Sequence, residues 1–395
     1  MTRRVLDVVN FNADASCLAA ADWLSALSGG EGSRFVRWLD LYVRHRKRIA
    51  LGLIGGTAAD LARHNPEAVA RIRSHPENFE IVLRPFAHDV ALLRSPAAFR
   101  LNVELGRRVL TDLFGAVSPF YLPPEFMLTN EQVCALASSG VRGVFINSRR
   151  FPDHVAREVP STPYLVEGIL GARLECLPLR GLLTQAYLDA LHDWSAAPWN
   201  AALASLSEAD PIGSWRDGES WLLIPDGLAR EEAWLAGEDG VERITLERAA
   251  AGAATRPPAV GYPVHSFASW VRELRMLGFL GRVERLEQRL SELPPEVRIA
   301  WLQAANSDVL SAVEKESPCV RLATAPPGAA GRDWIEHLIA RSVRGLEGEE
   351  YLVLAEGLEK DPSLRDWLGR SESPHVVKLR GRIDHVLSTV GVPDP

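Results

Sequence analysis

The residues with the clearest chemical potential are two carboxylates that follow short apolar segments. Glu125 comes directly after Phe120-Tyr-Leu-Pro-Pro and just before a helical pattern with Thr129 as its N-cap. Asp226 has the same kind of position, because it follows Trp221–Pro225, which is typical of a buried strand, and precedes another helical pattern. Folds of the α/β class place their catalytic side chains at the carboxyl ends of strands. Both residues are therefore candidate site carboxylates, although an ordinary solvated loop acid explains such a position equally well.

Further polar side chains lie at two other expected strand ends. Asn10, Asn12 and Asp14 alternate along the chain, so an extended backbone would place them on one face. Asp14 is also a good helix N-cap, which is the competing interpretation. Arg84 and His88 follow another short apolar run and would both face the same strand edge. A single histidine is more often a structural residue than a ligand, so His88 is a weaker candidate than its position suggests.

A metal site is a further possibility. If Asp14, His88 and a third ligand converged, their mixed oxygen and nitrogen donors would suit the metal of a hydrolytic deacetylase. The sequence has no paired HxxxH and no Asp-Asp dipeptide, so a metal is not expected. The four cysteines are far apart and show no CxxC spacing: Cys17, Cys134, Cys176 and Cys319. This spacing favours reduced core cysteines over disulfides or a zinc site.

Regularly alternating segments are expected to position these side chains. Up to about residue 150, apolar runs alternate with helical patterns, and the expected strands are Val5–Phe11, Arg48–Ile54, Phe79–Leu83, Ala116–Leu122 and Val141–Ile146. A strand followed by a helix, repeated several times, predicts parallel strands with right-handed crossovers. The expected fold is therefore α/β, with a complete or partial β/α barrel.

The rest of the chain suggests a division into several parts. We expect the barrel to occupy residues 1–262, with an irregular insertion near 149–218. The stretch from Ser266 to about Glu316 is almost entirely helical in pattern, and we expect residues 263–322 to form a helical domain that packs on the barrel. A Pro- and Gly-rich stretch at 323–331 indicates a linker, and residues 332–395 would form a small C-terminal α/β domain.

Composition excludes some functions. The 395 residues are 24% charged and 47% hydrophobic, with a net charge of −7, as in ordinary globular proteins. An acidic chain with a pI near 5.9 is not expected to bind nucleic acid through phosphate contacts. The N-terminal apolar run is broken by Asp7 and Asn10, so neither a secretion signal nor a membrane span is expected. A cytoplasmic location is the default expectation.

The order of several segments resembles glycoside hydrolase family 57. The segments are the helix at 57–70, Glu80–Leu93, Val109–Gly115, Tyr121–Glu125 continuing through Gly140–Val144, and Trp301–Asp308. The resemblance covers roughly residues 5–315 and rests on the order of the segments. It implies a (β/α)7-type barrel with a helical C-terminal extension, to which the residues beyond 331 add a small α/β tail.

The resemblance also implies a function. Members of this family act on α-glucans by a retaining mechanism, which needs one ionised and one protonated carboxylate and no cofactor. By this resemblance Glu125 matches the nucleophile, and Asp226 matches the acid/base position near a DxExxG pattern. The expected substrate is a saccharide. The residues that would hold its hydroxyls are Asn10, Asn12, Asp14, Arg84, His88 and Tyr121.

The sequence departs from the family pattern in several loops. The first loop lacks a His-Gln-Pro type motif, Arg84 stands where a histidine commonly precedes the position of His88, and Leu228 stands where a glutamate follows the family aspartate. The tryptophan usual before the nucleophile is also missing. Two alternatives therefore remain beside the glycosidase or glucanotransferase. One is an inactive barrel that binds a saccharide, or a protein partner through the C-terminal domain, and the other is the metal-dependent deacetylase.

Overall fold

The structure is a computed structural model. Its described residues are 2–13, 20–147, 160, 162–168, 171–206, 212–251, 259–260, 283–294, 297–298, 301–302 and 370. The predicted linker lies outside these residues, and only residue 370 of the predicted C-terminal domain lies within them. The domain division therefore stays a prediction.

Among the described residues, no helix has the length and apolar character needed to cross a membrane.

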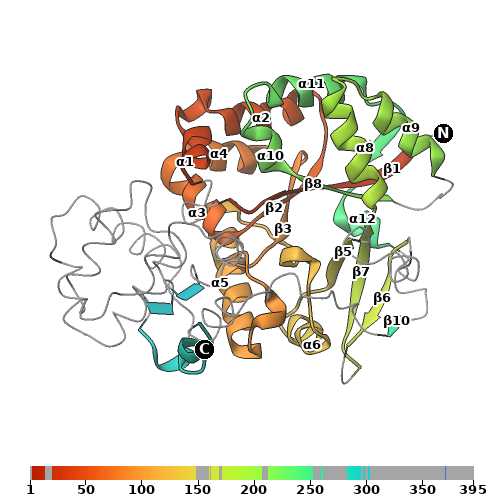
Figure 1. The fold of residues 1–395 in the computed structure, drawn as a ribbon. Coiled ribbons are helices and arrows are strands. Elements are labelled where there is room, and N and C mark those ends of the chain that lie inside the picture. Colours follow the sequence, from red (N-terminus) through yellow and green to blue (C-terminus); the bar gives the residue numbers. More distant parts are fainter. Residues whose placement is uncertain are drawn as a thin grey trace, which may run out of the picture.

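A ring of parallel strands forms the centre of the molecule (Figure 1). Its members are β1 (Arg3–Phe11), β2 (Ile49–Leu53), β3 (Phe79–Leu83), β4 (Ser118–Tyr121), β5 (Gly143–Asn147), β7 (Arg173–Leu179) and β8 (Ile212–Asp217). Neighbours pair in the order β1, β2, β3, β4, β5, β7 and β8. The ring closes because β8 pairs in parallel with both β7 and β1. The predicted (β/α)7 barrel is thus confirmed.

Both faces of the barrel strands are buried. Leu6 and Val8 of β1 belong to the core inside the ring, whereas Val5 and Val9 belong to the core between the ring and its helices. Strands that are covered on both sides have near-continuous apolar runs, which explains why five of them are recognisable in the sequence. The alternation also fixes the direction of every other side chain along a strand.

Helices surround the ring (Figure 1). They are α1 (Ala20–Leu27), α2 (Arg34–Arg44), α3 (Gly55–His64), α4 (Pro66–Ser74), α5 (Pro96–Phe114), α6 (Asn130–Ser138), α8 (Gly181–His192), α9 (Ala197–Ser205), α10 (Gly218–Leu222), α11 (Gly227–Gly237) and α12 (Leu246–Ala250). The 3-10 helices are η1 (Gly30–Gly32), η2 (Ala91–Leu93), η3 (Pro124–Phe126) and η8 (Leu290–Glu292). The predicted N-cap Thr129 forms a capping box with Gln132 at the start of α6.

Two expectations about the middle of the chain are wrong. Trp221–Pro225 is not a strand, since α10 covers its first two residues. The seventh barrel strand is β8 instead, and both β7 and β8 lie inside the segment predicted as an irregular insertion. The reason is that β8 carries Ser214 and Arg216 on its buried outer face, where both bond to Asp7. A strand with such polar residues has no apolar run to detect.

Three further strands lie beside the ring. β6 (Tyr164–Glu167) pairs antiparallel with β7, and β10 (Ala259–Val260) pairs with β6. β9 (Val241–Arg243) pairs in parallel with β1. Beyond the barrel, the described side chains of Val283, Leu286 and Trp301 are buried in the same core as the helices around the ring. This part of the predicted helical region therefore packs on the barrel.

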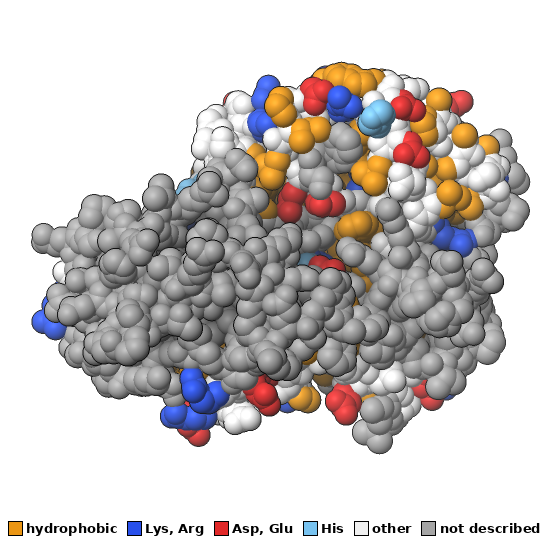
Figure 2. Space-filling view, in the orientation of Figure 1, with side chains coloured by type: hydrophobic (Ala, Val, Ile, Leu, Met, Phe, Trp, Pro, Cys, Tyr) orange, Lys and Arg blue, Asp and Glu red, His pale blue; other side chains and the backbone are white. Residues whose placement is uncertain are grey.

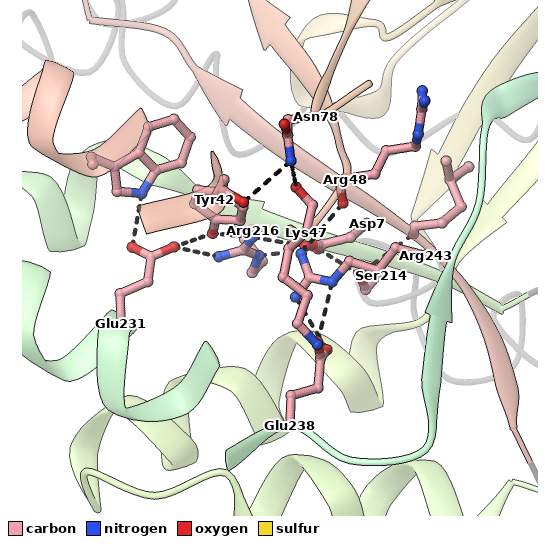
Figure 3. Close-up of polar contacts among 12 residues, drawn as sticks. Asp7, Tyr42, Lys47, Arg48, Asn78, Ser214, Arg216, Glu231, Glu238 and Arg243 are labelled. Carbon is pink, nitrogen blue, oxygen red and sulfur yellow. Dashed lines mark hydrogen bonds and ion pairs between the residues drawn. The ribbon is translucent and has the colours of Figure 1, made fainter. Parts of the chain in front are cut away.

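A network of buried charges joins β1, β8 and β9 on the helix-facing side of the ring (Figure 3). Both oxygens of Asp7 accept hydrogen bonds from Arg216, at 3.0 and 2.8 Å, and Oδ2 also accepts from Arg243 at 2.6 Å. Arg216 donates to Glu231 at 2.8 Å, and Arg243 donates to Glu238 at 3.1 Å. Burial alone would raise the pKa of Asp7, but the two arginines hold it below its usual value.

Candidate active site

Glu125 lies on an unusual turn directly after β4. Pro123 and Pro124 end the strand, and η3 follows. Glu125 has φ 51° and ψ 12°, and Phe126 has φ 54°, so two successive residues other than glycine have left-handed backbones. Each such residue costs about 1–2 kcal/mol, so the surrounding contacts must hold this turn in place.

The Glu125 carboxylate faces the loop that follows β3. Its Oε1 lies 3.9 Å from Nε2 of His88, and its side chain is 16% exposed. His88 itself is almost completely buried. The structure thus brings together the predicted nucleophile and one predicted substrate-binding residue, and it leaves the carboxylate accessible.

Arg84 follows β3 and connects three strand ends. It is buried, and it donates to the carbonyl of Leu122 at 2.9 Å and to Oδ1 of Asn12. Burial lowers its pKa to about 10, opposed by the nearby Tyr121, Glu125 and Glu219. Its hydrogen bonds hold the loop after β4, which carries Glu125, against the end of β1.

Two carboxylates at the end of β8 belong to the same region, although sequence reasoning did not select them. Asp217 is the last residue of β8 and lies beside Asn10 of β1. Glu219 accepts hydrogen bonds from the backbone N–H groups of Asn12 and Ala13, which fixes the start of α10 to the end of β1. The signal that could have found them is the Asp217-Gly-Glu219 sequence, which fits the Asp-x-Glu part of the family pattern.

The alternation of β8 directs Asp217 toward the mouth of the barrel. Ser214 and Arg216 point outward to Asp7, so Trp215 and Asp217 point to the other side. Trp215 packs accordingly against the core inside the ring. The Asp217 carboxylate also accepts a hydrogen bond from the backbone N–H of Glu219 at 3.1 Å and so caps α10. This places a second acid at the carboxyl edge of the ring.

Asp226 has different surroundings. It is the N-cap residue of α11, its side chain is 44% exposed, and it forms an ion pair with Arg230 at 2.8 Å. Hydrogen bonding from Arg230 lowers its pKa. Arg230 also donates to the carbonyl of Leu191 in α8, so the described contacts of Asp226 lie among the outer helices. None of the described contacts around Arg84 includes Asp226.

The remaining predicted ligands divide into two groups. Asn10 is buried at the barrel mouth and donates to Asn12 at 2.9 Å, and its Oδ1 has no partner among the described residues. Tyr121 is fully buried on the outer side of β4, where its ring packs against Phe99 at 6.1 Å. Tyr121 therefore points away from the barrel mouth, and its predicted role in holding a sugar is wrong. Asp14 lies outside the described residues.

The described residues contain no group of three or more His, Cys, Asp or Glu side chains arranged to hold a metal ion. Acidic, histidine and hydrophobic side chains lie together near the middle of the face that Figure 2 shows.

No protein-family model and no curated protein matches the sequence. Solved structures do match. A family 57 branching enzyme from Pyrococcus horikoshii aligns with a TM-score of 0.64 at 9% identity, over 100% of this chain and 98% of that one. A family 57 branching enzyme from Thermococcus kodakaraensis, solved with glucose, aligns with a TM-score of 0.63 at 11% identity, over 99% and 96%. The chain has a divergent family 57-like fold.

The predicted resemblance is thus confirmed at the level of the fold. The 4-alpha-glucanotransferase from Thermococcus litoralis aligns with a TM-score of 0.57 at 13% identity, over 77% of this chain. This chain spans 55% of the length of that enzyme. Identities this low establish the fold alone, so activity has to be argued from the site.

Proposed function

We propose that this protein hydrolyses or transfers glycosidic bonds of an α-glucan by a retaining mechanism, with Glu125 as nucleophile and Asp217 as general acid/base. The observation that carries the proposal is a chain of hydrogen bonds at the barrel mouth. Arg84 donates to the Leu122 carbonyl after β4 and to Oδ1 of Asn12, and the Asn12 N–H donates to Glu219 after β8. The loop after β4 and the segment after β8 therefore meet at one place. The solved structures with this fold include branching enzymes and a glucanotransferase, which supports a glucan as substrate.

The chemistry follows from two acids in opposite protonation states. The Glu125 carboxylate attacks the anomeric carbon while the bond to the leaving oxygen breaks, and Asp217 gives its proton to that oxygen. A water or a sugar hydroxyl then gives its proton to Asp217 and attacks the same carbon, which releases Glu125. Water as acceptor gives hydrolysis, and a sugar hydroxyl gives transfer.

Other residues of the mouth have supporting roles. The buried Oδ1 of Asn10 lacks a partner, as does Nε of Arg84, among the described residues. A buried polar atom without a hydrogen bond costs about 1–3 kcal/mol, so a sugar hydroxyl that reached either atom would bind favourably. His88, at 3.9 Å from Glu125, is placed to orient the nucleophile or to contact the sugar.

The test is a screen of α-linked oligosaccharides with the wild type and three variants. Glu125→Gln and Asp217→Asn should each lose activity by about 10²–10⁴-fold, since each removes a group needed in the transition state. Asp226→Asn should stay within about twofold, because Asp226 is paired with Arg230 on the outer layer. If Asp226→Asn loses activity and Asp217→Asn does not, the original sequence assignment is the correct one.

The same screen tests the alternative of an inactive barrel. Equal background activity of the wild type and Glu125→Gln on every substrate would contradict the enzyme proposal. Saccharide binding by the wild type would then favour a binding module.

A further inference from the structure

We infer that Phe126 and Trp215 are positioning residues whose contact across the barrel mouth sets the separation between the Glu125 and Asp217 carboxylates. This inference rests on the proposed function for its catalytic consequence. The ring centroids lie 5.7 Å apart at an interplanar angle of 81°, which is a favourable edge-to-face contact. Neither residue was a candidate in the sequence.

The contact joins opposite sides of the ring. Phe126 follows β4 and Trp215 lies in β8, and these strands are separated by β5 and β7 in one direction and by β3, β2 and β1 in the other. In a ring of seven, no two strands are farther apart in pairing order. The path between the two carboxylates through the strand pairs is therefore long, whereas the path through the two aromatic rings is short.

Each ring is close in sequence to one of the proposed catalytic acids. Phe126 immediately follows Glu125, and Trp215 precedes Asp217 by two residues on the same face of β8. Phe126 is 3% exposed and belongs to the core inside the ring, and Trp215 packs against that core. A change in the size of either ring should therefore shift one acid relative to the other.

The Phe126–Trp215 contact is important because it anchors the turn in which Glu125 and Phe126 have left-handed backbones. The turn is bounded by hydrogen bonds from Phe126 N–H to the Pro123 carbonyl, at 3.1 Å, and from Met127 N–H to the Pro124 carbonyl, at 3.0 Å. These local bonds close a short turn but do not fix its direction relative to β8. The buried Phe126 ring provides that long-range attachment.

Separation matters because it determines the reaction. Retaining glycosidases place their two carboxyl groups about 5–5.5 Å apart, and a larger gap of about 6.5–9.5 Å leaves room for a water and leads to inversion. A misplacement of about 1 Å can lower the rate about 10²-fold. By holding the two carboxyl groups at a fixed separation, the Phe126–Trp215 contact would thus determine both the rate and the stereochemical outcome of the reaction.

The first experiment compares two matched variants of the full chain. Phe126→Leu removes one ring of the Phe126–Trp215 contact, and Phe99→Leu removes one ring of the similar 84° contact between Phe99 and Tyr121 behind β4. Both phenylalanines are buried, so their replacement should lower the melting temperature by similar amounts. We expect kcat to fall about 10–100-fold in Phe126→Leu, with KM within about threefold, and to stay within about twofold in Phe99→Leu. Equal losses in the two variants would overturn the inference.

A double variant tests whether the two rings act as a pair. Trp215→Phe should lower kcat in the same way as Phe126→Leu, and Phe126→Leu/Trp215→Phe should lose little more than the worse single variant. Losses that multiply would show that the rings act independently and would contradict the inference.

A structural measurement separates this inference from the proposed function. Crystal structures of the wild type, Phe126→Leu and Phe99→Leu give the Glu125–Asp217 carboxyl separation without any substrate. We expect this separation to change by about 1 Å or more only in Phe126→Leu. If the separation is unchanged, the positioning role is wrong even where the protein proves to be a glycosidase. If it changes in a protein without activity, the positioning role holds and the proposed function fails.

Discussion

The two faces of the β1–β8 strand pair differ sharply in how their polar groups are satisfied. On the helix-facing side, Asp7 and Arg216 belong to a buried network in which three carboxylates meet two arginines and a lysine (Figure 3). At the barrel mouth, Asn10 of β1 and the neighbouring Arg84, which follows β3, are equally buried, but each keeps one polar atom without a described partner. The first arrangement fixes the strands, and the second keeps bonding capacity for a ligand.

The pKa values of two buried aspartates differ for the same reason. Asp7 has its pKa lowered by Arg216 and Arg243, against the effect of burial. Asp89, next to His88, has its pKa raised to about 6 by burial, and Arg94 at 3.5 Å offsets only part of this effect. Full pairing thus keeps one acid ionised, while partial pairing moves the other toward neutrality.

The largest expected effect comes from breaking the network. Arg216→Met leaves the buried Glu231 without its arginine and Asp7 with one arginine in place of two, so the free energy of unfolding should fall by about 3–5 kcal/mol. Urea denaturation measures the loss. The control is Arg230→Met, which breaks the exposed pair with Asp226 and should change stability by less than about 1 kcal/mol. Similar small losses in both variants would show that the network does not fix the strands.

The next effect is a dependence on pH. Asp89 has a folded-state pKa of about 6 and an ordinary value of 3.8, so the folded protein holds this proton more tightly than the unfolded chain. The stability that neutral Asp89 contributes is therefore complete below pH 3.8 and is lost as the pH rises through about 6. The shift corresponds to at most about 3 kcal/mol.

Asp89→Asn tests this dependence. The variant keeps a neutral side chain at every pH, so between about pH 4 and pH 6 its unfolding free energy should fall less than that of the wild type. Urea melts at a series of pH values measure the difference. Parallel pH profiles for the two proteins would contradict the assignment to Asp89.

The smallest expected effect on stability is at the mouth. Asn10→Ala removes a side chain that already lacks one partner, so the unfolding free energy should fall by less than about 1 kcal/mol, while KM for the substrate should rise. Asn78→Ala is the matched control, because its amide donates to the carbonyls of Tyr42 and Lys47 in the network. That variant should lose about 1–3 kcal/mol with KM unchanged. A large loss of stability with unchanged KM in Asn10→Ala, together with a raised KM in Asn78→Ala, would contradict the difference between the two faces.

Much of the barrel could be predicted because its strands are buried on both sides. Five strands and the N-cap at Thr129 follow directly from apolar runs and turn residues. β8 could not be predicted in this way, because Arg216 and Ser214 are stabilised there by Asp7, more than 200 residues earlier in the chain. Long-range pairing of charges leaves no local pattern.

The site was predictable in part for a related reason. The structure brings together five predicted residues that lie at or just after the ends of recognisable strands: Asn10, Asn12, Arg84, His88 and Glu125. Asp217 could not be predicted because its strand has no apolar run, whereas Asp226 follows the apolar run at 221–225 and has the pattern of a strand-end acid. The sequence also does not show on which side of β4 the Tyr121 side chain lies. That side depends on the register of β4 in the sheet, and Pro123 and Pro124 mark only where the strand ends.

The central claim, that Glu125 is the nucleophile and Asp217 its acid/base partner, has a direct test. Asp217→Asn is incubated with an α-glucosyl fluoride, whose fluoride leaves without a proton, and the digested protein is examined by mass spectrometry. We expect a glucosyl adduct on the peptide that contains Glu125, because the variant forms the intermediate faster than it breaks it down. An adduct on another carboxylate, or turnover of the fluoride without any adduct on Glu125, would contradict it.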